Sequence, residues 1–399
     1  MWQEIKNTYH LFSAILACVL YAFPTKYLTV IGVTGTDGKT TTVNLIYHIL
    51  KSTNKNVSMI SSVKAVINGK DYDTGFHVTT PSSWKVQAFL KKAAGELQNK
   101  KDGYMILEVT SHAIDQQRIW GVNFDVAVLT NVTHEHLDYH KTYENYVKTK
   151  IKLLQKAKIG IYNRDDRSYE VINSKYTIKN AKWLTYGIKN IADITLKEFP
   201  IKTTLVGEYN TYNILAAVAV CKQLGLTDEK IKKAIQTFRL PVGRGEIVYE
   251  NSFTVMIDFA HTPNAINQLL SALRPQVKGK LIHVFGSAGK RDIKKRPAMG
   301  EAAARYADTV ILTAEDPRGE NVLTISQEII SGMPDKDQEK VSIIPDRQEA
   351  INKAIFLAKK GDFVVITGKG HEQSMNYGSG EVLWTDHEGV EKALRLRSV

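Results

Sequence analysis

A glycine-rich stretch near the N-terminus contains the residue types that could bind phosphate. Residues 32–41 read GVTGTDGKTT, after an apolar run and before a helical stretch. Glycines let backbone N–H groups approach phosphate oxygens, and a helix N-terminus adds a positive dipole end. Lys39 would neutralise phosphate charge, and the Thr40 hydroxyl would bind Mg²⁺. We therefore predict a nucleoside triphosphate site, with Val33 standing where the ordinary Walker pattern has its first glycine.

The elements that must position this loop form two series of short apolar runs. Each run ends in polar residues, and helical stretches lie between the runs. The expected strands are 28–33, 104–109 and 125–130 in the first series, and 253–258, 280–285, 309–313 and 363–367 in the second. This alternation predicts an α/β fold with mainly parallel sheets. Polar residues after such strands are site candidates, because ligands bind beyond the carboxyl ends of parallel strands.

The segment LPVGRGE at 240–246 is the expected hinge, since it combines a proline with two glycines. We place the domain boundary near residue 239. The predicted parts are an apolar N-terminal helical segment (1–27), a central nucleotide-binding domain (28–238) and a C-terminal domain (239–399).

Composition narrows the class of protein. The chain has 399 residues, 43% hydrophobic and 24% charged, as in soluble globular proteins. A formal net charge of +12 suits polyanionic ligands such as nucleotides. The lysines are dispersed and not interleaved with aromatics, which argues against nucleic acid. The two cysteines, Cys18 and Cys221, form no CxxC pair, so a zinc ribbon or disulfide framework is not expected.

The stretch from Tyr9 to Phe23 is nearly all apolar. It is short for a membrane-spanning helix, which needs about 20 residues. A helix docked on the protein is the leading interpretation, followed by a membrane-surface helix and then a true anchor. We expect a cytoplasmic protein, with membrane-surface contact through residues 9–23 as an open alternative.

Further motifs follow the loop in a fixed order. They are TTPSS (79–83), EVTSHA (108–113), TNVTHEHLDYH (130–140), NRDD (163–166), GEYNTYN (207–213), GRGE (243–246), DFAHTPNAI (258–266), FGSAGKRDIKKRPAMG (285–300), EDPRGE (315–320) and GKGHE (368–372). With the G-x-x-G-x-D-G-K-T loop, this series resembles the Mur ligase family over residues 28–399. The likeness is greatest to the branch that adds the third residue of the peptidoglycan peptide.

The resemblance implies a P-loop ATPase-type central domain and a Rossmann-like C-terminal domain. It also implies a monomer that uses ATP and two Mg²⁺ ions to join an amino acid to a muramoyl-peptide acceptor. In such ligases ATP phosphorylates the acceptor carboxylate, and the amine of the incoming amino acid attacks the acyl phosphate. Because three anions meet there, Mg²⁺ and cationic side chains must supply electrostatic stabilisation.

Four residues are metal and catalytic candidates together with Lys39. Glu108 ends an apolar run, where its carboxylate could reach a metal beside Thr40, and His136 follows another run. The resemblance makes His136 a ligand of the second metal, and it leaves His134 and His140 as hydrogen-bonding residues. It also makes Lys150 a carbamylated lysine, since the carbamate would be an anion able to bind Mg²⁺. The residues alone would make Lys150 a solvated helix lysine.

By the same resemblance, the nucleotide is held by both domains. Its expected contacts are Gly35, Thr36, Asp37, Gly38, Lys39, Thr40, Thr41, Asn210, Asn213, Arg244, Asp258 and His261. An arginine at a hinge could couple domain closure to phosphate binding. Helix capping is the alternative role for the two asparagines.

The substrate contacts follow from the remaining motifs. Thr79, Thr80, Thr110, Gln116 and Arg118 match contacts to the acceptor, and Arg291, Glu315, Asp316, Arg318, Gly368 and Glu372 match contacts to the incoming amino acid. Arg318 would pair with a distal carboxylate, as in meso-diaminopimelate. Family members selective for that substrate often read D-N-P-R where this chain reads E-D-P-R. Asp316 could therefore favour the plain distal amine of L-lysine.

Several alternatives remain open at this stage. Only about 27 residues precede the first strand, whereas the family carries a separate UDP-binding domain there. Either UDP is held differently, or the acceptor is lipid-linked or otherwise not a free UDP-sugar. Competing functions are a folate- or cyanophycin-type ligase, a Mur-like amidotransferase subunit, and a non-catalytic nucleotide-binding module.

Overall fold

The computed structural model describes residues 2–75, 78–95, 103–176 and 182–398. These residues form two compact units. Unit 1 comprises Met1–Thr133, His140–Leu205 and Tyr209–Arg239, and unit 2 comprises His134–Tyr139, Val206–Glu208 and Leu240–Val399.

The sheet of unit 1 has the strand order β4-β3-β2-β5-β1-β6-β7-β8 among the described residues. The strands are β1 (Leu28–Thr34), β2 (Asn56–Ile60), β3 (Ala65–Ile67), β4 (Lys70–Tyr72), β5 (Gly103–Glu108), β6 (Phe124–Leu129), β7 (Ala157–Asn163) and β8 (Lys182–Tyr186). Strands β2, β5, β1, β6, β7 and β8 are parallel, and β3 and β4 add an antiparallel edge. The predicted mainly parallel α/β sheet is confirmed.

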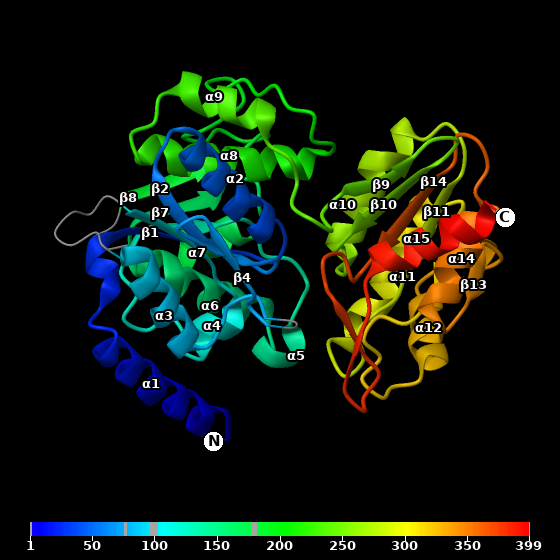
Figure 1. The fold of residues 1–399 in the computed structure, drawn as a ribbon, viewed down its shortest axis with the longest axis horizontal. Coiled ribbons are helices and arrows are strands. Elements are labelled where there is room, and N and C mark those ends of the chain that lie inside the picture. Colours follow the sequence, from blue (N-terminus) through cyan, green and yellow to red (C-terminus); the bar gives the residue numbers. More distant parts are fainter. Residues whose placement is uncertain (1, 76–77, 96–102, 177–181, 399) are drawn as a thin grey trace. The chain divides into compact units, whose positions relative to one another are not determined.

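Helices lie along this sheet (Figure 1). They are α1 (Trp2–Leu20), η1 (Pro24–Tyr27), α2 (Lys39–Ser52), α3 (Ser83–Ala94), α4 (Ser111–Asp115), α6 (Tyr143–Gln155), α7 (Ser168–Lys175), α8 (Glu208–Gln223) and α9 (Asp228–Thr237). In the short helix α5 (Leu137–His140), Leu137–Tyr139 belong to unit 2 and His140 to unit 1. Helix α6 shows why these segments are helical. Thr142 caps it by accepting a hydrogen bond from the Asn145 backbone N–H, and Val147, Ile151 and Leu154 bury one face.

Helix α1 packs against α3 through small residues. Ala14, Ala17 and Cys18 are fully buried. A Cβ atom at Gly121 would lie 2.4 Å from Cys18 Sγ, so glycine is needed there for this close approach. In the part of the chain that the structure describes, no helix has the length and apolar character needed to cross a membrane.

The main sheet of unit 2 has the order β13-β12-β11-β14-β10-β9, parallel except for the antiparallel β9 at one edge. The strands are β9 (Glu246–Glu250), β10 (Thr254–Asp258), β11 (Leu281–Phe285), β12 (Thr309–Leu312), β13 (Val341–Ile343) and β14 (Phe363–Thr367), with a separate hairpin of β15 (Ser374–Asn376) and β16 (Glu381–Leu383). The helices are α10 (Pro263–Leu273), η2 (Arg274–Gln276), η3 (Ile293–Lys295), α11 (Arg296–Tyr306), α12 (Val322–Ile330), α13 (Asp335–Gln338), α14 (Arg347–Leu357) and α15 (Asp386–Arg397).

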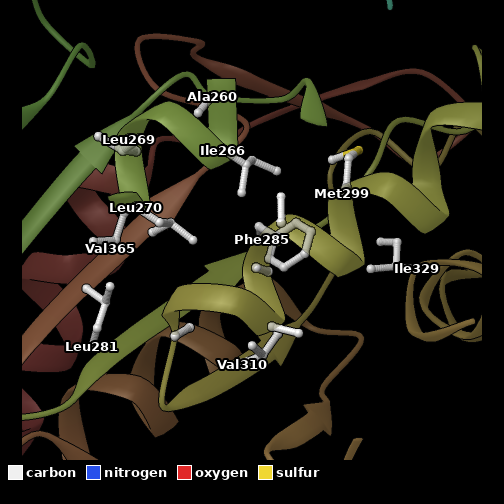
Figure 2. Close-up of a cluster of buried hydrophobic side chains, with 14 of the residues drawn as sticks. Ala260, Ile266, Leu269, Leu270, Leu281, Phe285, Met299, Val310, Ile329 and Val365 are labelled. Atoms are coloured by element: carbon white, nitrogen blue, oxygen red, sulfur yellow. The ribbon is translucent and has the colours of Figure 1, made fainter. Parts of the chain in front are cut away.

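The core of unit 2 follows from the two-residue period of its strands. On β11, Leu281 and Phe285 point to one face, where Leu270 of α10 and Met299 of α11 pack on them (Figure 2). The alternate residues Ile282 and Val284 belong to the cluster beneath α14 and α15 on the other face. Because helices cover both faces, the carboxyl ends of the strands are left to build a site.

Candidate active site

Three neighbouring strands of unit 1 deliver the phosphate loop and its partners to one edge of the sheet. The order β5-β1-β6 places the end of β1, where the loop begins, between Glu108 at the end of β5 and Thr130 just after β6. The motifs at 32–41 and 108–113 and residues 130–133 therefore meet, although they are distant in sequence.

The loop adopts a backbone that requires glycine at two positions. Gly35 and Gly38 have φ values of +152° and +81°. A Cβ atom on Gly38 would lie 2.2 Å from Asn213 Oδ1, and one on Gly35 would lie 1.7 Å from Thr130 Oγ1. These close approaches keep the loop narrow, so that its N–H groups and the N-terminus of α2 suit a phosphate chain.

The side chains of the loop are held by its own backbone and by neighbouring segments. Lys39 Nζ donates a 2.7 Å hydrogen bond to the Thr36 carbonyl oxygen. The Asp37 backbone N–H donates to Asn131 Oδ1 at 2.9 Å. Thr41 is buried in the first turn of α2. Asn131 was not among the predicted site residues, although its place directly after β6 could have indicated it.

Asn210 and Asn213, the two asparagines expected among the nucleotide contacts, lie inside helix α8, not at its cap. Both are buried, and Asn213 Nδ2 donates to Asn210 Oδ1 at 3.3 Å. Asn213 Oδ1 also accepts a 3.5 Å hydrogen bond from Thr42 of α2. The structure thus brings Asn213 directly against the phosphate loop.

Glu108 is the centre of an oxygen-rich group. Its Oε1 accepts hydrogen bonds from Thr40 Oγ1 at 3.0 Å and from Ser62 Oγ at 2.9 Å, and its Oε2 accepts one from the Ser62 backbone N–H at 2.8 Å. A carboxylate beside a hydroxyl suits Mg²⁺, which keeps most of its other positions for water and phosphate oxygens. Among the described residues no group of three or more His, Cys, Asp or Glu could hold a metal. Ser62 was missed, yet it follows β2, the parallel neighbour of β5.

Lys150 lies on the buried face of α6 beside the phosphate loop. Its side chain is 1% exposed, its Nζ lies 4.4 Å from the centre of the Tyr146 ring, and it donates a 2.7 Å hydrogen bond to the Gly35 carbonyl oxygen. Lys148 is exposed and Lys152 is partly exposed. Of these three lysines, the structure therefore brings Lys150 to the loop.

The two neighbouring candidates from the histidine-rich motif lie in different units. His136 belongs to the segment His134–Tyr139 of unit 2, where its Nδ1 lies 3.7 Å from Glu135 Oε1. His140 belongs to unit 1, and its Nε2 lies 2.9 Å from Ser111 Oγ. Burial lowers the pKa of His140 to about 4, so this ring is neutral at pH 7.

The five predicted acceptor contacts of unit 1 form one connected group next to Glu108. Thr80 Oγ1 donates to the Glu108 carbonyl oxygen at 2.9 Å and accepts from the Thr110 N–H at 3.0 Å. Arg118 donates to the Thr80 carbonyl oxygen at 3.1 Å and to Gln116 Oε1 at 2.6 Å. Ser62 Oγ links Thr79 to this group at 3.1 Å. One arginine thus lies beside the hydroxyls expected to bind an acidic acceptor.

In unit 2 the remaining nucleotide-binding candidates lie next to the carboxyl end of strand β10. Asp258, at the end of β10, accepts hydrogen bonds from the Gly245 N–H at 2.6 Å and the Ala260 N–H at 2.7 Å. The Arg244 guanidinium lies 4.2 Å from the centre of the Phe259 ring. Burial and the neighbouring Lys295 lower the pKa of His261 to about 3, so His261 offers a neutral ring.

Glu315 and Gly368 meet at the ends of β12 and β14. A Cβ atom on Gly368, whose φ is +104°, would lie 2.4 Å from Glu315 Oε2. Burial raises the pKa of Glu315 to about 8, so this carboxyl is mostly protonated at pH 7. Arg347 braces both strand ends by donating to the Ala314 carbonyl oxygen at 3.0 Å and the Thr367 carbonyl oxygen at 2.9 Å.

The remaining amino-acid candidates form a charged cluster around Lys369. Lys369 is fully buried, and its Nζ lies 2.8 Å from Asp316 Oδ1 and 2.6 Å from Glu372 Oε2. Arg318 Nη2 lies 3.4 Å from Asp316 Oδ2, and Arg318 Nη1 is a buried donor with no hydrogen-bond partner among the described residues. Burial and the nearby Arg318 lower the pKa of Arg291. Lys369 lies within the GKGHE motif, but it was not among the predicted site residues.

Comparison with known proteins gives matches over most of the chain. The Mur ligase middle domain matches residues 33–221, and the Mur ligase, glutamate ligase domain matches residues 243–370. UDP-N-acetylmuramoyl-L-alanyl-D-glutamate--2,6-diaminopimelate ligase 1 from Clostridium acetobutylicum is 34% identical over 96% of this chain and 81% of its own length. The UDP-N-acetylmuramoyl-L-alanyl-D-glutamate--2,6-diaminopimelate ligase from Aquifex aeolicus is 38% identical over 93% of this chain and 78% of its own length.

Solved structures agree with this assignment. A UDP-N-acetylmuramoyl-L-alanyl-D-glutamate--2,6-diaminopimelate ligase, 29% identical, superposes with a TM-score of 0.59 over 93% of this chain and 79% of its own. A folylpolyglutamate synthase from Mycobacterium tuberculosis, at 17% identity and a TM-score of 0.69 over 90% of this chain and 92% of its own, shares the fold. The fold and the phosphate loop define an ATP-dependent, ADP-forming acid–amino-acid ligase. The chain belongs to the Mur ligase family.

Proposed function

We propose that the chain joins 2,6-diaminopimelate to the D-glutamate carboxylate of UDP-N-acetylmuramoyl-L-alanyl-D-glutamate, in peptidoglycan synthesis. Relatives that bear this activity in their names are 34% and 38% identical to it over nearly the whole chain. The observation that favours diaminopimelate over lysine is the buried ion pair between Lys369 and Asp316.

Because of this ion pair, Asp316 is not needed to bind the distal ammonium of a substrate such as lysine. Asp316 Oδ1 already accepts hydrogen bonds from Lys369 Nζ and, at 3.0 Å, from the Asn376 N–H. Its negative charge is therefore compensated inside the protein. Arg318 keeps one buried donor, Nη1, that has no hydrogen-bond partner among the described residues, and a distal carboxylate would accept from it in a bidentate pair.

The net charge of the cluster supports the same choice. Arg291, Arg318 and Lys369 are cationic, whereas Asp316 and Glu372 are anionic, which leaves one positive charge in excess while Glu315 is protonated. The attacking amine must be neutral. In that form diaminopimelate carries two carboxylates and one ammonium, whereas lysine carries one carboxylate and one ammonium. The substrate with one excess negative charge complements the cluster.

In the proposed reaction a carboxylate oxygen of D-glutamate attacks the γ-phosphorus of ATP, and ADP leaves. The amine of diaminopimelate then attacks the acyl carbon, phosphate leaves, and the amine proton is lost to solvent. Lys39 neutralises the transferring phosphoryl group. Arg118, within the Thr80–Thr110 group, orients the acceptor carboxylate.

Two Mg²⁺ ions would screen the phosphates in this proposal. Thr40 and Glu108 would hold one ion, and Lys150, as a carbamate, would hold the second. The support for Lys150 is its burial next to the loop, since an anion in that place would bind a cation shared with the nucleotide. The positive charge that Lys150 carries without CO₂ would repel Mg²⁺.

The proposal is tested by measuring ADP release with a panel of acceptors and amino acids. We expect turnover with UDP-N-acetylmuramoyl-L-alanyl-D-glutamate plus meso-diaminopimelate, and a kcat/KM at least about tenfold lower with L-lysine. Mass spectrometry of the product identifies the new amide. Turnover with a folate or with a lipid-linked acceptor, and none with the UDP-linked dipeptide, would disprove the proposed acceptor.

A further inference from the structure

Helix α1 leaves a continuous apolar stripe exposed on the surface of unit 1. Its members follow the three- and four-residue spacing of one helix face, and Phe23 extends it just past the helix. They are Tyr9, Phe12, Leu16, Val19, Leu20 and Phe23, with exposed fractions between 41% and 71%. Single exposed apolar residues are normal in soluble proteins, but a contiguous stripe of this kind marks a surface that binds something.

The stripe is not the result of a loosely attached helix. The opposite face of α1 is fixed to the body of unit 1 by specific contacts. Cys18 Sγ donates a hydrogen bond to the Trp120 carbonyl oxygen at 3.1 Å and accepts one from Gln87 Nε2 at 3.1 Å. Trp84 Nε1 donates to Ser13 Oγ at 2.9 Å. The structure therefore holds the apolar face outward.

The elements that carry and adjoin the stripe, α1, η1 and α3, have an excess of positive charge, although the Asp115 carboxylate accepts a hydrogen bond from Asn7 of α1. Exposed lysines lie near its two ends, Lys6 on α1 and Lys26 on η1. The adjoining α3 contributes three lysines, and Glu4 is the only acidic residue in the sequences of α1, η1 and α3. Helix α1 and the short helix η1 both pack against α3. A second copy of the chain would present the same excess of positive charge and would be repelled.

We propose that this face docks on an anionic lipid bilayer, with α1 lying in the plane of the membrane surface. An apolar helix face bordered by lysines inserts into the region between headgroups and acyl chains, and each lysine near the surface adds attraction to anionic lipid. Trp84, half-exposed beside α1, has the amphipathic ring that favours this depth. The protein would then work at the membrane without spanning it.

Co-sedimentation of the full chain with lipid vesicles tests this inference independently of the proposed ligase activity. We expect binding to vesicles of equal parts phosphatidylglycerol and phosphatidylcholine, and weaker binding to pure phosphatidylcholine. Phe12→Ser with Leu16→Ser should lower the partition coefficient at least about tenfold. The matched control is Phe356→Ser with Leu357→Ser, because these residues are exposed on α14 of unit 2; it should bind like wild type.

A second variant separates charge from apolar contact. Lys6→Gln with Lys26→Gln should weaken binding to the anionic vesicles by about tenfold or more and leave binding to phosphatidylcholine nearly unchanged. Light scattering reports the oligomeric state of the same samples. The inference is overturned if wild type does not sediment with anionic vesicles, or if Phe12→Ser with Leu16→Ser binds normally. A dimer that this variant dissociates, without vesicle binding, would assign the stripe to self-association.

Discussion

Lys150 Nζ donates a 2.7 Å hydrogen bond to the carbonyl oxygen of Gly35, which joins the buried face of α6 to the phosphate loop. A free ammonium can make this bond, whereas a carbamate places an anion at the same location. Carbamate formation needs the neutral amine and CO₂. The hydrogen bond to Gly35 is therefore a contact of unmodified Lys150, and we propose that Lys150 is modified in the active enzyme.

The carbamate is tested by replacing Lys150. Lys150→Ala should abolish ADP release, and short carboxylates should restore part of it by replacing the missing anion. Labelling with ¹³CO₂ followed by NMR should show a carbamate signal in wild type that the variant lacks. Lys148→Ala, an exposed change on the same helix, should behave as wild type. The assignment is refuted if wild type shows no labelled carbamate and Lys150→Ala is active.

The phosphate loop predicts a large effect for one lysine of α2. Lys39→Ala should lower acceptor-dependent ADP release by about 10³-fold, in line with the loss of a key contact to the transferring phosphoryl group. Circular dichroism should show an unchanged fold. Lys51→Ala, at the exposed end of the same helix, is the matched control. Near-normal turnover in a folded Lys39→Ala would remove this residue from the mechanism.

Arg318 should carry the preference for a distal carboxylate. In Arg318→Ala we expect the KM for diaminopimelate to rise by roughly 30- to 1,000-fold, since a charge-assisted bidentate contact in a closed site is lost. Turnover with lysine, which lacks that carboxylate, should change little. Arg305→Ala on α11 controls for the loss of one positive charge from unit 2. The carboxylate assignment fails if wild type prefers lysine and the variant keeps that preference.

The ion pair between Lys369 and Asp316 predicts that substitution of Lys369 lowers stability, whereas substitution of Asp316 changes substrate binding little. Lys369→Met removes the buried cation beside Asp316 and the partly buried Glu372 and should destabilise unit 2 by about 3–5 kcal/mol. Asp316→Asn keeps an oxygen acceptor and the pair with Glu372, so its KM for diaminopimelate should change less than about tenfold. Urea unfolding and steady-state kinetics measure the two effects. A rise of about 100-fold in KM for Asp316→Asn, with unchanged stability, would return Asp316 to a role in binding the ammonium.

Glu315 predicts a pH dependence of stability. Its pKa of about 8 in the folded protein lies above the ordinary glutamate value of 4.5, so between these values the folded state holds a proton that the unfolded state has lost. The contribution of Glu315 to stability therefore falls as pH rises through this window. Relative to wild type, Glu315→Gln should gain up to about 1.4 kcal/mol in free energy of unfolding per pH unit. A constant difference between pH 5.5 and 7.5 would contradict the raised pKa.

The sequence by itself determined the elements that depend on local patterns. The apolar run at 28–33 followed by two spaced glycines, Gly35 and Gly38, predicted a strand, a tight loop and a helix, because backbone conformation and hydrophobic period are encoded within a few residues. It also placed Glu108 at a strand end. The selection of Lys150 came only from the family resemblance, because the residues alone made it a solvated helix lysine; its burial on α6 is seen in the structure.

Only the tertiary structure decided which distant residues meet. Ser62 reaches Glu108 because β2 lies beside β5, and this strand order is set by the packing of the whole sheet. Asp316 and Lys369 are 53 residues apart, and only the folded chain pairs them. A sequence shows that Asp316 is acidic, but whether that charge is available to a substrate depends on the buried partner beside it. In the same way, the apolar residues 9–23 became a surface only when small residues fixed one side of α1 to the protein.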